Sequence, residues 1–298
     1  MYPRAFEYFA PDSIPEVLEL LSRYGEEAKL LAGGQSLIPL MKLRLVNPRI
    51  LVDIGRLQHL AYVREEDDSL RLGALTCHTY VLESTLVRQR FPLMADAVSV
   101  IGDTQVRNWG TVGGALAEAD PAGDWGPVVL ALDAGIRCVG PKGERVLGMD
   151  SFFVDAYTTQ VAPDELLTEV VFPLPSEGSS GAYLKLERRA GDFAVVSVAV
   201  QLSLDQKATC RAAGIALGAA GLTPIKAVEA EAFLSGKEIR PDVIEEAGER
   251  VFQAAQPLPD IRGSEEYKRA AARSLFKRAV EIAVRRYQGE TLEAGHVH

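Results

Sequence analysis

The segment that most constrains the fold is Lys29-Leu30-Leu31-Ala32-Gly33-Gly34-Gln35-Ser36, in which a glycine pair separates two different apolar patterns. The apolar residues before the glycines predict a short buried strand, and leucines at helical spacing after them predict a helix that Ser36 can cap. A strand, a glycine turn and a helix start direct backbone N–H groups toward one point, which favours binding of an anion such as phosphate. A tight connection without a ligand explains the same residues, so this turn alone leaves both interpretations open.

A second glycine pair follows a similar run in Asn108-Trp109-Gly110-Thr111-Val112-Gly113-Gly114-Ala115. Two such turns facing each other would hold both phosphates of a diphosphate, one on each side. Neither segment matches G-x-G-x-x-G or G-x-x-x-x-G-K-[ST], so the motifs exclude a Rossmann or P-loop site. The prediction is a dinucleotide site of another architecture, and it fails if the two turns lie far apart in the fold.

Length and composition are those of a globular enzyme. At 298 residues the chain is long enough for about two domains. A formal net charge of −9 argues against a nucleic-acid-binding surface. No apolar run approaches the roughly 18 residues of a membrane span, and the first residues show no signal-peptide pattern. These features predict a cytoplasmic protein without a membrane span.

The cysteines and histidines indicate that the chain itself holds no metal centre. The cysteines are Cys77, Cys138 and Cys210. They are far apart and no C-x-x-C occurs, which argues against an iron–sulfur cluster or a structural zinc site. We interpret His59 and His78 as structural, and His296 and His298 as part of a frayed end.

Hydrophobic patterns predict an α+β fold, beginning with a β-α-β unit over residues 4–55. This unit contains a helix at 13–24 and strands at 29–32 and 50–54. Ser13 and Glu16 form a capping box at the start of the helix. The strand at 50–54 shows little alternation, which is typical of burial on both faces. Further predicted elements are strands at 69–74, 136–139, 145–147 and 166–172 and helices at 91–100 and 127–132.

The strongest domain boundary is at residues 173–181, where proline, glycine and serine are loop-forming throughout. The predicted elements after it are strands at 182–187, 195–204 and 212–219 and helices at 224–234, 243–255 and 264–287. The strands suit an antiparallel meander. Strands followed by helices predict a second, layered α+β domain.

Several sequence blocks in a fixed order carry a resemblance to a known family. The blocks are residues 32–39, 42–44, 101–108, 110–114, 119–124, 185–189, 191–194 and 260–264. With these blocks the chain resembles the FAD-binding medium subunit of the molybdenum hydroxylase family, which includes xanthine dehydrogenase and, most similar, aerobic carbon monoxide dehydrogenase. The resemblance extends over nearly the whole length.

The resemblance implies a two-part FAD-binding domain of the vanillyl-alcohol-oxidase (PCMH) type over residues 1–175, with subdomains at about 1–55 and 56–175. It implies a C-terminal domain of antiparallel sheet and three helices over 176–290, followed by a tail at 291–298. FAD would bind non-covalently between the domains, with both glycine turns on its diphosphate.

The residues that the resemblance assigns to FAD come from both glycine turns and from four other positions. The first turn supplies Lys29, Leu30, Leu31, Ala32, Gly33, Gly34, Gln35 and Ser36, and the second supplies Thr111, Val112, Gly113, Gly114 and Ala115. Asp124 would hydrogen-bond the cofactor, Ile101 would lie near the flavin ring, and Lys185 would approach from the second domain. Leu167, or Leu166 in its place, would contact the ring or the adenine side.

Four positions leave their roles open. Many relatives carry His at the position of Gln35, and Gln can still donate to a phosphate. Trp109 stands where relatives often carry Arg, so it either removes a cation or adds a stacking surface. Arg188 and Arg189 would stabilise negative charge on reduced flavin, unless they are solvated or paired with Glu187. Phe193 lies either against the flavin face or in the core.

No convincing nucleophile–base pair occurs in the sequence, and none is required where a flavin carries the redox chemistry. The resemblance implies that FAD accepts electrons from a [2Fe–2S] small subunit, fed by a molybdenum–pterin large subunit, and passes them to NAD+, a quinone or oxygen. It also implies a dimer of heterotrimers, either in the cytoplasm or at the inner membrane face through the complex. A self-sufficient FAD-dependent oxidase or reductase and a non-catalytic assembly subunit remain as alternatives.

Overall fold

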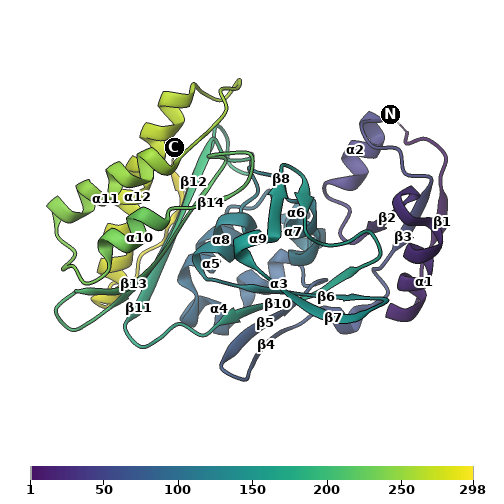
Figure 1. Cartoon of the computed structure of the whole chain (residues 1–298), viewed down its shortest axis with the longest axis horizontal. Helices are drawn as coiled ribbons and strands as arrows, with labels where there is room; N and C mark the ends of the chain where they lie inside the picture. Colours follow the sequence, from purple (N-terminus) through teal and green to yellow (C-terminus); the bar gives the residue numbers. More distant parts are fainter. Residues whose placement is uncertain (1, 298) are drawn as a thin grey trace.

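Three blocks, each built on one main sheet, lie side by side along the molecule (Figure 1). The computed structural model describes residues 2–297. The N-terminal block has a three-stranded parallel sheet, and the central and C-terminal blocks each have a five-stranded sheet in which nearly all pairs are antiparallel. The mixed architecture confirms the α+β fold predicted from the sequence.

The N-terminal block is the predicted β-α-β unit. Its elements are β1 (Glu7–Phe9), α1 (Ile14–Tyr24), β2 (Ala28–Leu31), α2 (Leu37–Leu43) and β3 (Ile50–Asp53), with 3-10 helices at Gly25–Glu27 and Gln58–Leu60. β3 pairs in parallel with both β1 and β2, and its apolar residues are buried on both faces, as predicted. The Ser13 hydroxyl accepts from the Glu16 N–H, but the Glu16 carboxylate accepts from the Asp12 N–H and does not close the capping box.

The central block is an antiparallel sheet with helices on one face (Figure 1). Its strands are β4 (Val63–Glu66), β5 (Ser69–Gly73), β10 (Leu166–Pro173), β6 (Gly135–Gly140) and β7 (Gly143–Gly148), in that spatial order, with a small hairpin of β8 (Phe153–Asp155) and β9 (Thr158–Thr159). Its helices are α3 (His78–Glu83), α4 (Thr85–Arg90), α5 (Pro92–Ser99), α6 (Thr104–Trp109), α7 (Val112–Glu118), α8 (Trp125–Ala131) and α9 (Met149–Phe152). The sequence did not predict β4 or the short helices α3, α4 and α6, whose apolar patterns are too brief to show a period.

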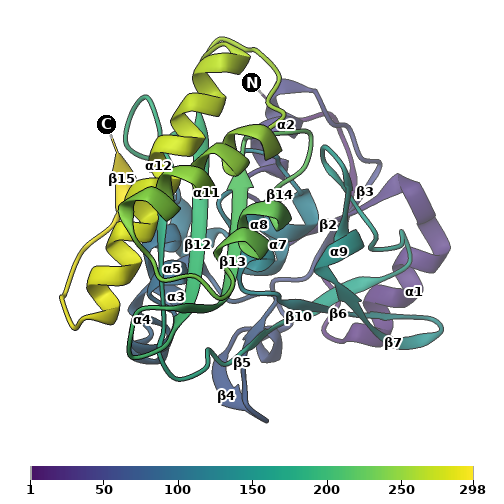
Figure 2. The ribbon, with the colours of Figure 1, turned by 60° about the vertical axis from the view of Figure 1, so that its left-hand side comes forward.

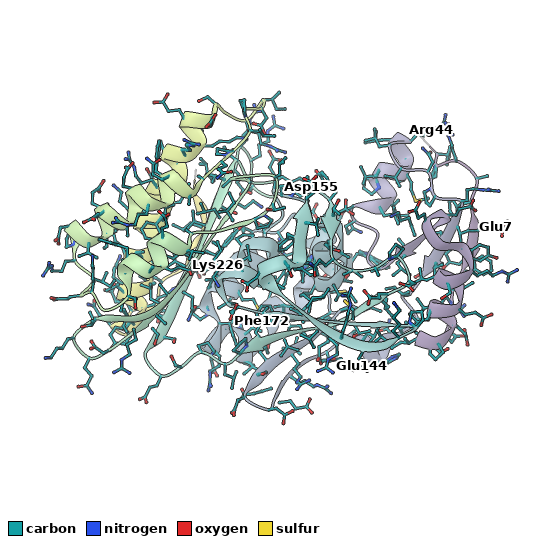
Figure 3. All side chains as sticks on the ribbon, viewed as in Figure 1. Glu7, Arg44, Glu144, Asp155, Phe172 and Lys226 are labelled. Atoms are coloured by element: carbon teal, nitrogen blue, oxygen red, sulfur yellow. The ribbon has the colours of Figure 1, made fainter. Side chains whose placement is uncertain are left out.

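Aromatic side chains join this sheet to its helices. The rings of Phe91 and Phe172 meet edge to face with their centroids 6.3 Å apart, and Trp125 lies 6.5 Å from Phe172. All three side chains are buried. Phe172, labelled in Figure 3, comes from β10 at the middle of the sheet. These rings therefore belong to the core between the central sheet and its helices.

The C-terminal block is the predicted antiparallel meander covered by helices. Its elements are β11 (Ser179–Leu186), β12 (Val196–Leu204), β13 (Cys210–Gly218), β14 (Ile225–Lys226), α10 (Val228–Leu234), α11 (Pro241–Ala254), α12 (Glu265–Tyr287) and β15 (Gly295–Val297). Figure 2 shows the three helices over one face of this sheet. β11 begins inside the segment predicted to be loop throughout, because Ser179–Gly181 pair with the far end of β12.

The chain after α12 does not fray as predicted. Gly295–Val297 form β15, which pairs in parallel with β11 at the edge of the sheet. The Arg286 guanidinium donates to the carbonyl of Leu292 and holds the intervening segment against the domain. His296 lies in this strand, and His298 lies outside the described residues. The docking depends on tertiary contacts, so no local pattern indicated it.

The C-terminal sheet is buried on both faces because it also packs against the central block. Along β11, Ala182 and Leu184 face the C-terminal helices, whereas the alternate residue Tyr183 belongs to the central core. α5 and α8 contact this second face of the sheet. The two blocks therefore share one interface with no solvent layer between them.

A buried ion pair crosses this interface. The Arg286 guanidinium on α12 donates to both carboxylate oxygens of Asp96 on α5, at 2.7 and 2.8 Å. The two side chains are only 10% and 8% exposed. Asp96 also accepts from the Tyr183 N–H on β11 at 3.2 Å, so one carboxylate joins three elements.

We predict that Asp96→Ala destabilises the protein by about 3–5 kcal/mol, because it leaves the Arg286 charge and the Tyr183 N–H without their acceptor. Chemical denaturation measures the free energy of unfolding. Glu27→Ala is the control: it removes an exposed pair with Arg49, whose side chains are 78% and 53% exposed, and should change stability by less than about 1 kcal/mol. Equal losses in the two variants would contradict the prediction.

Candidate functional site

The two glycine turns meet in the fold although they are far apart in the sequence. The first turn passes directly over the end of α6, where a Cβ on Gly33 would overlap the carbonyl oxygen of Trp109. A Cβ on Gly114 in the second turn would lie 3.6 Å from the Ala32 side chain. The two turns are therefore in direct contact, which satisfies the condition that the sequence set for a shared anion site.

The first turn presents free backbone donors. Gly34 has a φ of 70°, a left-handed conformation that glycine adopts without steric strain. The N–H groups from Gly33 to Ser36 donate to no acceptor within the described part of the chain. The side-chain amide of Gln35 donates to the Gly33 carbonyl at 3.2 Å and braces the turn from inside. Successive free N–H groups of this kind form a concave anion site.

Ser36 does not cap α2 as predicted. Its φ of −102° and ψ of −51° are helical, and its side chain makes no capping hydrogen bond. A capping side chain usually needs an extended backbone at this position to reach the N–H groups of the first turn. The Ser36 hydroxyl consequently remains available beside the free N–H groups.

Most backbone N–H groups of the second turn already donate within the protein. Every backbone N–H from Val112 to Ala115 donates within the chain, to the carbonyls of Thr76, Ala74 and Thr111 and to the Thr111 hydroxyl. Thr111 caps α7, and its hydroxyl accepts from the Gly114 N–H at 3.1 Å. The second turn therefore offers one N–H group, that of Thr111, without an acceptor among the described residues, whereas the first turn offers four. The spacing of Thr111 and Gly114, three residues apart, is the sequence signal of this cap.

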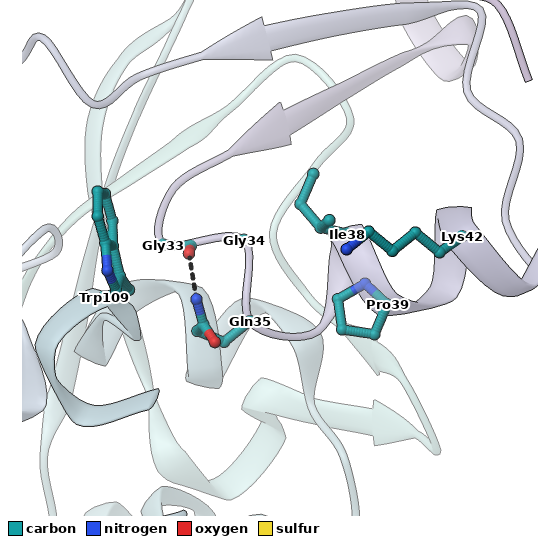
Figure 4. A pocket seen from close by; sticks show the side chains of 7 residues that line it. All are labelled: Gly33, Gly34, Gln35, Ile38, Pro39, Lys42 and Trp109. Atoms are coloured by element: carbon teal, nitrogen blue, oxygen red, sulfur yellow. Dashed lines mark hydrogen bonds between the residues drawn. The ribbon is translucent and has the colours of Figure 1, made fainter. Parts of the chain in front are cut away.

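A cleft of about 390 Å³ opens over the first turn (Figure 4). Its lining residues are Gly33, Gly34, Gln35, Ile38, Pro39, Lys42 and Trp109. The Trp109 indole and the Lys42 chain lie on opposite sides of the turn (Figure 4). Lys42 forms no ion pair with any described residue, so its charge can balance a bound anion. The sequence blocks contained Lys42, but no motif singled it out as a site residue.

Only part of the first segment faces this cleft. Leu30 and Ala32 pack against the N-terminal core, and Leu31 lies at the end of β2. Lys29 is exposed and lies near Glu118 at the end of α7. Burial raises the pKa of the Glu118 carboxyl, and the positive charge of Lys29 opposes that shift. The strand residues hold the turn in place, and Gly33, Gly34 and Gln35 line the cleft.

Asp124 and Lys185 lie together in a buried network between the central and C-terminal blocks. The Lys185 ammonium donates to Asp124 at 3.1 Å and to the Val100 carbonyl at 3.0 Å. The Tyr183 hydroxyl donates to the other Asp124 oxygen at 2.6 Å, and Glu187 lies 3.6 Å from the ammonium. Both Asp124 oxygens therefore have partners inside the protein.

Burial dominates the electrostatics of this network. It raises the pKa of the Asp124 carboxyl, whereas Lys185 and the Tyr183 hydrogen bond lower it. It also raises the pKa of Tyr183 well above 10, with Asp124 adding to the shift. The sequence analysis missed Tyr183, although it lies two residues before Lys185 on a strand and so shares its face.

Ile101 lies where the central block meets the loop that follows β11. Its side chain is partly buried against the central core, and its carbonyl accepts from the Arg107 guanidinium at 2.9 Å. Gly102, the next residue, touches Gly191, where a Cβ would lie 2.9 Å from the Gly102 carbonyl oxygen. The loop from the second domain therefore covers the segment to which the resemblance assigns the flavin ring.

That loop carries exposed cationic and aromatic side chains. Arg188 and Arg189 are exposed, in agreement with the alternative that they are solvated. Phe193 is 49% exposed, which rules out the interpretation as a core aromatic. All three side chains are exposed on the loop whose Gly191 touches Gly102.

Leu166 and Leu167 are both buried and pack into different cores. Leu166 belongs to the N-terminal core and Leu167 to the central core, because successive residues of a strand point to opposite faces. Neither lines the cleft over the first turn. The structure thus gives both leucines packing roles on the two faces of β10.

His78 supports the second turn from the core side, in agreement with its interpretation as structural. The backbone N–H of His78 donates to the Gly110 carbonyl at 3.0 Å, and a Cβ on Gly110 would lie 2.9 Å from the His78 ring. The Trp125 indole N–H donates to the His78 Nδ1 at 3.2 Å. Burial, with a smaller effect from the Arg107 charge, lowers the pKa of His78 to about 4.

Two models of protein families match the chain. The family described as "FAD binding domain in molybdopterin dehydrogenase" matches residues 4–175. The chain belongs to this family. The family described as "CO dehydrogenase flavoprotein C-terminal domain" matches residues 181–283. The first match contains both glycine turns, and the second contains Lys185 and the loop that follows it.

Relatives and solved structures agree with this assignment. The chain is 36% identical over 286 residues to the 6-hydroxypseudooxynicotine dehydrogenase complex subunit alpha of Paenarthrobacter nicotinovorans, covering 96% of this chain and 97% of that one. It is 37% identical over 283 residues to the carbon monoxide dehydrogenase medium chain of Hydrogenophaga pseudoflava, covering 95% and 98%. A solved structure of carbon monoxide dehydrogenase from H. pseudoflava superimposes with a TM-score of 0.93 at 38% identity, covering 96% of this chain and 99% of that one.

The described residues, 2–297, contain neither a cluster of metal-ligating side chains nor a membrane-spanning helix. No group of three or more His, Cys, Asp or Glu residues among them is arranged to hold a metal ion. Within the same residues, no helix combines the length and apolar character needed to cross a membrane.

We predict that His78 makes the folded state sensitive to mild acid. Because its folded pKa, about 4, lies below the ordinary value of 6.5, its contribution to stability is fully present above pH 6.5 and is lost as the pH falls toward 4. The loss should amount to about 3 kcal/mol, which urea denaturation at stepped pH measures. His78→Gln should flatten this part of the profile, and His59→Gln, at an exposed histidine, should leave it unchanged. An identical slope in wild type and His78→Gln would contradict the prediction.

Proposed function

We propose that this chain is the FAD-carrying medium subunit of a multi-subunit molybdenum hydroxylase. In this role it accepts electrons from an iron–sulfur partner and passes them to an external acceptor. The observation that carries the proposal is the contact of the two glycine turns, with the free N–H groups from Gly33 to Ser36 over a cleft. The family match supports FAD as the dinucleotide.

The residues of the cleft fit a diphosphate. The turn offers backbone donors where Gly33 rests on the Trp109 carbonyl with no room for a Cβ, and Lys42, which pairs with no described carboxylate, adds a positive charge. We assign the diphosphate to the residues from Gly33 to Ser36. The second turn, from Thr111 to Ala115, forms the wall of the same site, and Lys29 to Ala32 hold the first turn in position.

When bound, FAD supplies the electron-transfer chemistry, and the protein supplies orientation and charge. We assign the flavin ring to the region of Ile101, next to the buried pair of Asp124 and Lys185. Lys185 of that pair also donates to the Val100 carbonyl, next to Ile101. Arg188 and Arg189, on the loop whose Gly191 touches Gly102, would stabilise an anionic ring. Leu167 supports this region from the core of β10.

The names of the relatives support partner subunits. They are a "medium chain", a "medium subunit" and a "complex subunit". We propose a [2Fe–2S] small subunit as electron donor and a molybdenum–pterin large subunit as the site of substrate oxidation, in a dimer of heterotrimers. NAD+, a quinone or oxygen would be the acceptor, with the complex in the cytoplasm or at the inner membrane face. We further propose a domain division at residue 175, with β15 belonging to the second domain.

The substrate class does not follow from this chain. Relatives named for carbon monoxide, 6-hydroxypseudooxynicotine and glyceraldehyde are 36–37% identical to it, over nearly equal lengths. The nearly equal identities reflect the flavin-carrying role that these relatives share, and not their different substrates. Substrate choice in the proposed complex would belong to the large subunit.

We predict that the purified chain binds FAD at one per chain and oxidises no hydroxylase substrate by itself. The flavin spectrum after gel filtration measures the stoichiometry, and dye reduction with candidate substrates measures turnover. Turnover by the chain alone would support a self-sufficient oxidase or reductase instead. A protein that remains colourless after incubation with FAD would support a non-catalytic assembly role. Co-purification from the native host, with flavin and iron–sulfur absorbance, tests the partners.

We predict that Gly33→Ala weakens FAD binding by at least about tenfold, because its Cβ would push the first turn away from Trp109. Isothermal titration with FAD gives the dissociation constant. Gly148→Ala is the matched control, since a Cβ there meets nothing within 4 Å and the backbone is extended. Near-wild-type affinity in Gly33→Ala would place the diphosphate elsewhere.

A further inference from the structure

Trp109 is a large aromatic side chain that the fold leaves in the open. It ends α6, lines the cleft and is 67% exposed. Its indole N–H donates to no described acceptor. The other tryptophan, Trp125, is 2% exposed and uses its N–H on His78. The Trp125 indole is therefore part of the core, whereas the Trp109 indole is exposed to solvent.

The backbone of Trp109 and Gly110 is fixed by hydrogen bonds and by contact with the first turn. The Gly110 N–H donates to the Val106 carbonyl at 2.7 Å, and the Gly110 carbonyl accepts from His78. The Trp109 carbonyl lies against Gly33 of the first turn. An exposed aromatic ring on such a fixed backbone loses little conformational freedom when a ligand packs on it.

The two residues before Trp109 in α6 form hydrogen bonds away from the cleft. Arg107 donates to the carbonyls of Ile101 and Gly102, and the Asn108 side chain accepts from the Thr79 hydroxyl at 2.6 Å. Neither lines the cleft. Trp109 is thus the residue of this helix that faces the first turn, opposite Lys42 (Figure 4).

We propose that Trp109 is a stacking platform for a planar heteroaromatic ring of the dinucleotide, next to its diphosphate. The inference rests on the proposed FAD site and assigns one wall of it. The free N–H groups and Lys42 bind charge, whereas the indole face binds a ring that carries none. With the indole on one side and Lys42 and the N–H groups on the other, the cleft can hold both the ring and the diphosphate of one ligand. Both adenine and isoalloxazine have the required flat surface.

Fluorescence of the whole chain tests this assignment. FAD should quench the emission of the wild-type protein, because a ring stacked on an indole removes its fluorescence. Trp109→Leu should leave only the quenching of Trp125, which an absorbing flavin causes without stacking, and should weaken FAD binding by roughly ten- to hundredfold, the loss typical of one stacked base. Trp109→Phe should bind FAD with intermediate affinity, because it keeps a smaller ring. Tyr80→Leu is the control: Tyr80 is 70% exposed on the neighbouring helix α3 and does not line the cleft.

Titration with ADP and with FMN distinguishes the two rings. Quenching by ADP beyond that in Trp109→Leu assigns adenine to Trp109 and leaves the flavin ring in the region of Ile101. Such quenching by FMN supports the platform as well, but moves the flavin ring from Ile101 to Trp109. The platform is overturned if FAD binds wild type and Trp109→Leu equally tightly, or if bound FAD leaves the Trp109 emission unchanged. Failure of wild type to bind FAD would instead remove the proposed function itself. Circular dichroism confirms that each variant is folded before titration.

Discussion

The absence of a side chain at Gly33 sets the distance between the N-terminal and central blocks. Because the first turn rests on the Trp109 carbonyl with no space for a Cβ, two backbones define the site wall. Backbone positions shift less than long side chains, so the N–H groups of the first turn keep their directions without a ligand. The cleft is in this sense prepared before any anion enters, which reduces the ordering cost of binding.

Buried charge joins the other two blocks. Asp124 with Lys185, and Asp96 with Arg286, lie at the interface between the central helices and the C-terminal sheet. Buried pairs add little stability relative to apolar packing, but their geometry permits few alternatives. Tyr183 contributes to both, through its hydroxyl on Asp124 and its N–H on Asp96. One strand of the second domain is thereby fixed to two helices of the first.

Much of the fold could be predicted from the sequence because its longer elements carry clear periods. The central strand β3, the meander of the second domain and α12 all showed their burial patterns in the residues themselves. The short helices of the central block did not, since helices such as α6 are held by tertiary contacts and caps. β15 is the extreme case, because only the open edge of β11 makes it a strand.

The site was predicted in position and only partly in mechanism. The glycine pairs indicated that two segments approach a common ligand, and the structure brings them together. They could not reveal that the Thr76 and Ala74 carbonyls occupy the Val112 and Gly113 donors, or that Asp124 has two partners in the folded chain. Those facts depend on which neighbours reach a group first, which sequence spacing does not encode. Lys42 was missed for the same reason.

The pairing of β15 with β11 imposes an order on biosynthesis. β11 leaves the ribosome early in the second domain, whereas the strand that covers its outer edge emerges only after α10, α11 and α12. During that interval the nascent chain exposes unpaired peptide groups, to which a chaperone or a neighbouring polypeptide can add a strand. Premature termination after α12 would leave the same edge open permanently.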